Sequence, residues 1–119
     1  MTITVYGIPN CQTVKKARDW LDTHEIKYTF YDFKKQGVTK DLILIWLKKV
    51  DLNQLLNRSG MTYRNLTEQQ KLQSQNENDA IALMIQNPSM IKRPVLAISQ
   101  EIHLGFKDAD YVSLFGSTS

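Results

Sequence analysis

The opening of the chain constrains its fold most, because a strand, a tight turn and a helix follow one another with a cysteine at the junction. Apolar and polar residues alternate over Thr2–Tyr6, which predicts a strand. Gly7–Asn10 is a turn signal, and apolar residues at three- and four-residue spacing predict a helix from about Cys11 to His24. A second strand is expected at Lys27–Phe33. This order fits a right-handed parallel crossover.

The remainder of the chain predicts a block of helices followed by a return to strands. The expected elements are a helix from Thr39 to Val50, a helical turn at Asp51–Leu56, a capping box at Thr67–Gln70, a helix at Glu77–Gln86, strands at Pro94–Ile98 and Glu101–Phe106, and a last helix at Ala109–Phe115. Without the middle block, four strands with flanking helices remain. The sequence therefore predicts an α/β, thioredoxin-like fold, a mixed four-stranded sheet with an inserted helical subdomain. We expect one domain over 1–119, with its core at about 1–35 and 92–119 and the insertion at about 36–91.

Composition narrows the classes of function. The 119 residues are 42% hydrophobic and 23% charged, an ordinary globular mix. The net charge of +3 favours small anionic ligands but is too weak to indicate nucleic-acid binding. The longest apolar run, Leu42–Leu47, is too short to span a membrane, and the chain opens without a signal-peptide pattern, so we expect a cytoplasmic protein. No histidine or carboxylate pattern suggests a metal site.

Cys11 is the only cysteine of the chain, and the pattern places it where a helix begins. Unpaired amides and the helix dipole stabilise a thiolate there, and Lys15 and Lys16 add positive potential. The alternative is that Cys11 is a small buried hydrophobe, as lone cysteines often are. Dithiol enzymes carry a second cysteine three positions on, and here that residue is Val14. Turnover at Cys11 would therefore need an external thiol, for which glutathione is the expected co-substrate, with no bound cofactor.

Two arginines stand out among the basic residues. Arg93 precedes Pro94 at the start of a predicted strand, where a cis peptide costs little, and its guanidinium could hold an oxyanion. The alternative is that Lys92 and Arg93 are an ordinary solvated pair. Arg58 follows a predicted helical turn, and from local sequence alone it is a surface residue.

Several segments together resemble the arsenate reductase (ArsC)/Spx family, and in particular its YffB-like branch. The matching segments are Val5–Cys11, Lys15–Leu21, Leu55–Arg58, Ile91–Pro94 and Leu104–Phe106. The resemblance implies the inserted thioredoxin fold and a reductase-type activity that depends on glutathione. It identifies Cys11 with the catalytic cysteine and Arg93-Pro94 with an arginine and cis-proline that contact the substrate.

The resemblance also implies that Asn10 and Arg58 take part in substrate binding, although in direct register the family's arginine falls at Asn57. Two positions depart from the arsenate reductases: Gly7 replaces a histidine and Gly105 replaces a third arginine. Both departures count against arsenate as the substrate. The resemblance thus predicts a glutathione-dependent monothiol oxidoreductase that acts on an oxidised thiol or a small oxyanion.

Two other functions remain open from the sequence. An Spx-like, redox-responsive regulator would bind RNA polymerase. It ranks second because the redox switch of that branch often uses two cysteines, and Val14 removes the second. The third alternative is a protein that keeps only the fold, in which Cys11 serves packing.

Overall fold

A computed structural model describes residues 2–116. Its sheet has four strands in the order β2-β1-β3-β4, with bounds β1 (Ile3–Gly7), β2 (Thr29–Asp32), β3 (Val95–Ile98) and β4 (Glu101–Leu104). β2 runs parallel to β1, whereas β1 and β3, and β3 and β4, pair antiparallel. The predicted α/β fold with a mixed four-stranded sheet is confirmed.

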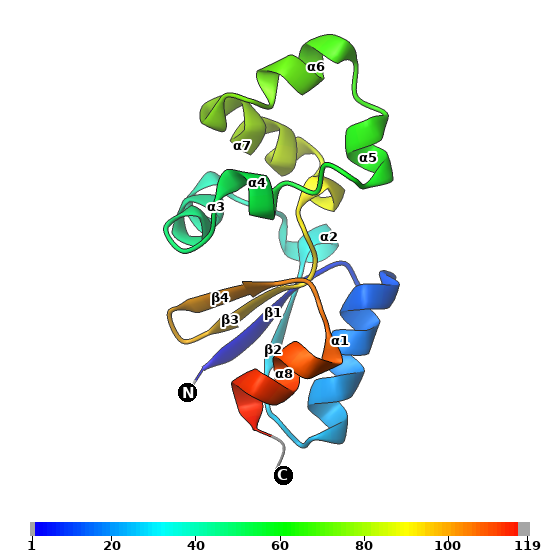
Figure 1. The fold of residues 1–119 in the computed structure, drawn as a ribbon, viewed down its shortest axis with the longest axis vertical. Helices are drawn as coiled ribbons and strands as arrows, with labels where there is room; N and C mark the ends of the chain where they lie inside the picture. The colour runs from blue at the N-terminus through cyan, green and yellow to red at the C-terminus, as the bar shows by residue number, and fades with distance from the viewer. Residues whose placement is uncertain (1, 117–119) are drawn as a thin grey trace. The chain divides into compact units, whose positions relative to one another are not determined.

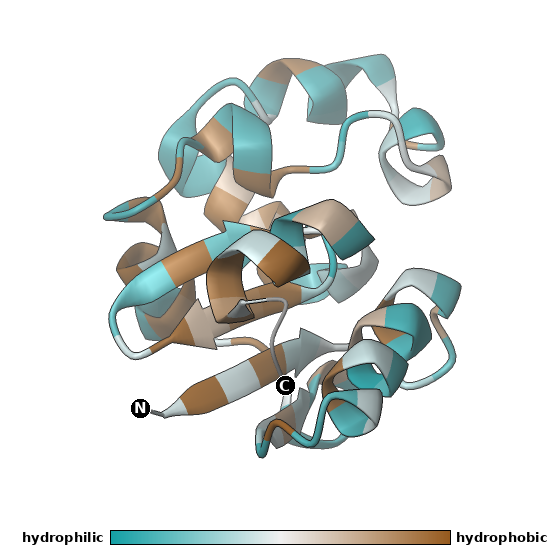
Figure 2. Ribbon diagram, turned by 60° about the horizontal axis from the view of Figure 1, so that its bottom comes forward, coloured by the Kyte–Doolittle hydropathy of each residue, from teal (hydrophilic) through white to brown (hydrophobic). Residues whose placement is uncertain are grey.

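One face of the sheet is covered by α1 (Gln12–Thr23) and α8 (Asp108–Phe115), which lie on the same side in Figure 1. Buried and partly exposed residues alternate along β1, and Figure 2 shows this as brown and pale bands on the strand that leaves the N-terminus. Ile3 and Val5 therefore point toward these helices. The apolar core between sheet and helices comprises Ile3, Val5, Ala17, Trp20, Leu21, Leu96, Ile98 and Tyr111. Trp20 also donates from Nε1 to the Asp108 carboxylate over 2.8 Å, which links α1 to the start of α8.

Between β2 and β3 the chain is helical. The elements are α2 (Phe33–Gln36), α3 (Lys40–Leu47), α4 (Leu52–Leu55), α5 (Met61–Arg64), α6 (Glu68–Gln73), α7 (Glu77–Gln86) and the 3₁₀ turn η1 (Pro88–Met90). The predicted caps are present, because Thr39 accepts from the Leu42 amide and Thr67 from the Gln70 amide. Within residues 2–116, no helix has the length and apolar character needed to cross a membrane.

The chain divides into two compact units, which we call the sheet unit (Met1–Lys34 with Arg93–Ser119) and the insertion unit (Lys35–Lys92). Each is described by itself. The predicted single domain over 1–119 stays a prediction, and Met1 and residues 117–119 lie outside the described residues.

Some predicted boundaries differ from the structure. The second strand was expected to reach Phe33 but ends at Asp32, because the Asp32 carboxylate accepts a hydrogen bond from the Lys34 amide (2.8 Å) and Phe33 begins α2. The helix expected to continue to Val50 ends at Leu47. α5 was not predicted, and none of its residues is buried.

Candidate active site around Cys11

Cys11 is the N-cap residue of α1, with extended backbone angles (φ −95°, ψ 127°). Its N–H donates to the Ile8 carbonyl (3.2 Å) and its carbonyl accepts from the Lys15 amide (2.9 Å), so the turn before the helix and the first helical turn meet at this residue. The side chain is half-buried and makes no capping hydrogen bond. A thiol at this position lies beside the positive end of the helix dipole, and its sulfur is not committed to the helix amides.

The lysines that follow Cys11 contribute less positive charge than the sequence suggests. Lys15 Nζ forms an ion pair with Asp19 one turn further along α1, at 2.8 Å, and both side chains are exposed. Lys16 is exposed as well. Exposed charges of this kind are screened by solvent and salt, so the two lysines add little to the positive potential of the helix amides at Cys11.

Arg93 and Pro94 lead into the sheet at the end where the Cys11 turn leaves it. Tyr6 pairs with Val95 in the β1–β3 register, so β1 finishes where β3 starts. The Arg93–Pro94 peptide bond is cis, Pro94 is buried and Arg93 is half-buried. The Pro94 carbonyl accepts a hydrogen bond from the Gly105 amide (2.9 Å), which holds the start of β3 against the end of β4.

Four of the five residues predicted for the site therefore belong to the sheet unit: Asn10, Cys11, Arg93 and Pro94. Asn10 is exposed in the turn immediately before the cysteine. The topology brings the Cys11 turn and the Arg93–Pro94 segment to one end of the sheet. Their roles toward a substrate stay predictions.

Arg58, the fifth predicted residue, belongs to the insertion unit and is held by its neighbours there. Its Nη1 donates to the Tyr63 hydroxyl (2.9 Å) and the Ser74 hydroxyl (3.3 Å), and its Nη2 donates to the Asn53 side-chain oxygen (3.1 Å). We call Arg58, Asn53, Tyr63 and Ser74 the Arg58 cluster. The Ser74 hydrogen bond, followed by the hydrogen bond and charge of Arg58, lowers the pKa of Tyr63 below its usual range.

The Arg58 side chain also lines a cavity of about 330 Å³ within the insertion unit. Lys92 lines the same cavity, together with the polar side chains of Asn53, Gln54, Asn57 and Ser59. The sequence offered Lys92 only as part of a basic pair, and no local pattern connected it with Arg58. Among the residues that the structure describes, the lining of this cavity includes two cationic side chains and no carboxylate, which suits an anionic group.

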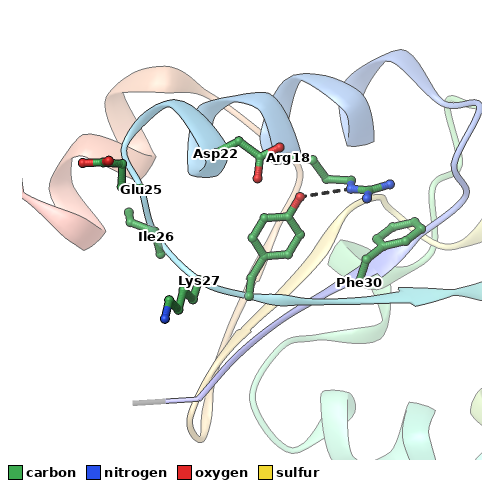
Figure 3. A pocket seen from close by; sticks show the side chains of 7 residues that line it. Arg18, Asp22, Glu25, Ile26, Lys27 and Phe30 are labelled. Atoms are coloured by element: carbon green, nitrogen blue, oxygen red, sulfur yellow. Dashed lines mark hydrogen bonds between the residues drawn. The ribbon is translucent and has the colours of Figure 1, made fainter.

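A larger groove of about 700 Å³ lies in the sheet unit, along the second half of α1 and the approach to β2 (Figure 3). Arg18 reaches across it, with its guanidinium carbon 3.9 Å from the ring centre of Phe30, and its Nε donates to the Tyr28 hydroxyl (3.2 Å). Asp22 and Glu25 line the same groove, so its charge is mixed. The part of the chain that the structure describes contains no group of three or more histidine, cysteine or acidic side chains placed to hold a metal ion.

A mixed four-stranded sheet whose first helix starts at a single cysteine defines a thioredoxin-like protein with one candidate thiol nucleophile. Residues 6–114 match the family model described as the ArsC family. The match extends over most of the chain, so the protein belongs to the ArsC family.

Solved structures and curated sequences agree with this assignment. A structure described as a YffB protein is 43% identical, with a TM-score of 0.88, and the match covers 94% of this chain and 97% of that one. An arsenate reductase (ArsC) related protein from Brucella melitensis is 46% identical, with a TM-score of 0.78, over 97% of this chain and 95% of that chain. An uncharacterized protein of Haemophilus influenzae is 35% identical over 95% of this chain and 98% of its own length.

Named regulators are more distant relatives. The global transcriptional regulator Spx of Staphylococcus haemolyticus is 25% identical over 89% of this chain and 81% of its own length. The proteins similar to this chain thus include some described by reductase names and some described by regulatory names.

Proposed function

We propose that this protein is a glutathione-dependent monothiol oxidoreductase whose nucleophile is Cys11. The observation that carries the proposal is the half-buried Cys11 side chain at the N-cap of α1, with no capping hydrogen bond to occupy its sulfur. Membership of the ArsC family supports a reductase-type activity. Because glutathione is kept reduced in the cytosol, the proposal includes a cytoplasmic location.

The proposed reaction has two exchange steps at one sulfur. The Cys11 thiolate attacks the glutathione sulfur of a glutathione mixed disulfide, and the substrate leaves as a thiolate that takes a proton from water. A second glutathione, as its thiolate, then attacks the glutathione sulfur bound to Cys11. That step releases the Cys11 thiolate and glutathione disulfide. One disulfide is consumed and one is formed, so the substrate sulfur is reduced and the incoming glutathione sulfur is oxidised.

An external thiol is required in the second step because Cys11 is the chain's only cysteine. The residue three positions on, Val14, is fully buried and carries no reactive group. The thiolate of a second glutathione therefore serves as the nucleophile of the second step.

Binding of the glutathione moiety is assigned to the neighbours of Cys11. The exposed Asn10 amide can form hydrogen bonds, and Arg93 supplies a guanidinium for a carboxylate or a small oxyanion. Pro94 lies beside Arg93 at the same end of the sheet. The assignment of Arg58 to substrate stays a prediction, since three side chains of its own unit already accept or share its hydrogen bonds.

The test is turnover of a glutathionylated peptide by the full chain in the presence of glutathione, with formation of glutathione disulfide as the readout. We expect Cys11→Ser to abolish turnover and mass spectrometry to find glutathione on Cys11 of the wild type. Arg93→Met should lower kcat/KM by roughly tenfold or more, because a hydrogen bond to a charged group contributes about 1.5 to 3 kcal/mol. Arg64→Met is the matched control, since Arg64 is exposed on α5. Wild-type turnover in Cys11→Ser would exclude the proposal.

The second candidate function is that of an Spx-like regulator that binds RNA polymerase. The observation that favours it is the match of the global transcriptional regulator Spx over 89% of this chain. Retention of purified RNA polymerase by the immobilised protein tests it. Retention that Cys11→Ser leaves unchanged, together with no turnover of the glutathionylated peptide, would favour the regulator over the enzyme.

A further inference from the structure

Gly7, the last residue of β1, is a glycine for reasons of space and not of backbone conformation. Positive φ angles among the described glycines occur at Gly37, Gly105 and Gly116, and Gly7 is not one of them. Its backbone is therefore open to any L-residue. A different constraint must exclude a side chain at this position.

That constraint is the side chain of Val14 in the first turn of α1. A Cβ placed on Gly7 with standard geometry would lie 2.7 Å from Val14 Cγ2 and 3.2 Å from Cγ1, and the first of these distances is too short for real atoms. The Val14 Cβ would lie at 3.6 Å, an ordinary van der Waals distance. Val14 is fully buried and β-branched, so its methyl groups cannot turn away at low cost. A side chain at position 7 and the two methyl groups at position 14 exclude each other.

The close contact between Gly7 and Val14 joins the two ends of the segment that carries Cys11. The segment runs from the end of β1 through the turn to the first turn of α1, and backbone hydrogen bonds from Cys11 to Ile8 and from Lys15 to Cys11 tie its parts together. A shift of α1 away from β1 would move the helix amides relative to the Cys11 sulfur. Those amides are the groups that stabilise a thiolate at a helix start.

We propose that Gly7 and Val14 act as one coupled pair of positioning residues, which seats the start of α1 on the end of β1 and so sets the environment of the Cys11 thiol. The inference rests on the proposed role of Cys11 as nucleophile. It also determines what can approach the nucleophile, because with valine at position 14 no side chain can be presented from position 7. A chain that uses a side chain at position 7 needs a smaller residue at position 14.

The test uses the rate of Cys11 alkylation by iodoacetamide as a function of pH, alongside the thermal unfolding midpoint. We expect Gly7→Ala to slow alkylation several-fold at about pH 6 and to displace its pH dependence to higher pH, since a lost helix-amide interaction favours the thiol over the thiolate. Val14→Ala alone should lower the unfolding midpoint by several degrees, because it leaves a cavity.

The double variant Gly7→Ala/Val14→Ala should recover the wild-type pH dependence, because the two Cβ atoms meet at an ordinary distance. Gly7→Ala/Val14→Thr is the matched control. Threonine keeps the branched shape of valine but puts a hydroxyl group in place of a buried methyl group, so Val14→Thr alone is measured as its baseline. Relative to that baseline, the control should show the same change in alkylation that Gly7→Ala shows relative to the wild type.

If Gly7→Ala does not fold, the unfolding midpoints of the double variants decide. The proposal requires that Gly7→Ala/Val14→Ala folds and that Gly7→Ala/Val14→Thr is less stable than Val14→Thr alone. Two results would overturn the proposal. One is a folded Gly7→Ala variant that is alkylated like the wild type. The other is a Gly7→Ala/Val14→Ala variant whose alkylation is no nearer to that of the wild type than the alkylation of Gly7→Ala/Val14→Thr. Alkylation needs no glutathione. Recovery by the double variant in a protein without turnover would therefore refute the oxidoreductase function and leave the coupled pair intact.

Discussion

The sheet unit and the insertion unit are held together in different ways. In the sheet unit, strands from both ends of the sequence pair with one another, and the helices cover them with a core that is almost wholly apolar. In the insertion unit, α5 and α6 contribute no buried residue. They are held by caps and by the Arg58 cluster. Burial of apolar surface stabilises the first unit, whereas part of the second depends on satisfied polar groups. The α5–α6 part of the insertion unit should therefore be more sensitive to the loss of a polar partner than the sheet unit is.

The largest effect is expected from a cavity in the sheet unit. Leu96 is fully buried in β3, between β1 and β4, so Leu96→Ala should lower the free energy of unfolding by about 3 kcal/mol. Urea denaturation measures it. Leu72→Ala, the same substitution at an exposed position of α6, is the matched control and should have almost no effect. Equal losses in the two variants would contradict the comparison.

Removal of the Arg58 guanidinium should destabilise the insertion unit selectively. Arg58→Met removes three hydrogen bonds while it keeps most of the side-chain volume, and we expect a loss of about 2 kcal/mol. Hydrogen exchange should show faster exchange of amides in α5 and α6 and unchanged exchange in the sheet. Arg64→Met again controls for the loss of charge. Uniformly faster exchange across the chain would argue against a local role for the cluster.

Tyrosine-to-phenylalanine substitutions should change the free energy of unfolding in opposite directions in the two units. The Tyr111 hydroxyl is buried and has no hydrogen-bond partner among residues 2–116, so Tyr111→Phe should stabilise the protein by about 1 kcal/mol. Tyr63 accepts from Arg58, and Tyr63→Phe should destabilise by a similar amount of about 1 kcal/mol. Both changes remove one oxygen, and thermal unfolding compares them. The same sign in both variants would show that polar satisfaction does not distinguish the units.

The smallest effects concern titration at alkaline pH. Burial raises the pKa of Tyr6, with a further contribution from Tyr31, and burial also raises the pKa of Tyr111, whereas the pKa of Tyr63 is lowered. Tyr6 and Tyr111 therefore stay protonated to a higher pH in the folded protein than in the unfolded chain. Their contribution to stability is lost as the pH rises above about 10. Tyr63 acts in the other direction, because its contribution grows as the pH rises from its lowered pKa toward about 10.

The phenolate absorbance of the folded protein measures this difference. The first phenolate to form should belong to Tyr63, and Tyr63→Phe should remove that early step while it leaves the later ones. An unchanged early step in Tyr63→Phe would assign it to another tyrosine and contradict the expected order.

Features that depend on neighbouring residues were predictable from the sequence. The strand, turn and helix around Cys11, the caps at Thr39 and Thr67, and the helix Glu77–Gln86 are all signalled within a few residues. The mixed sheet followed from the order of these elements.

Features that depend on distant residues were not predictable. α5 has no buried face to produce a periodic signal, and its side chains Tyr63 and Thr62 form hydrogen bonds with Arg58 and Ser89, of which Ser89 is distant in sequence. The same holds within the candidate site, where nothing local indicates that Val14 excludes a side chain from Gly7. The partners of Arg58 likewise became visible only in three dimensions.

The positions of the two tryptophans give each unit its own fluorophore. Trp20 is buried in the core of the sheet unit, where its ring stacks on His24 at a centroid distance of 3.7 Å, and Trp46 is buried in α3 of the insertion unit. Variants that keep a single indole would report emission from one unit at a time. Stopped-flow unfolding of the two single-tryptophan variants in denaturant would reveal whether the sheet unit and the insertion unit unfold together or one after the other.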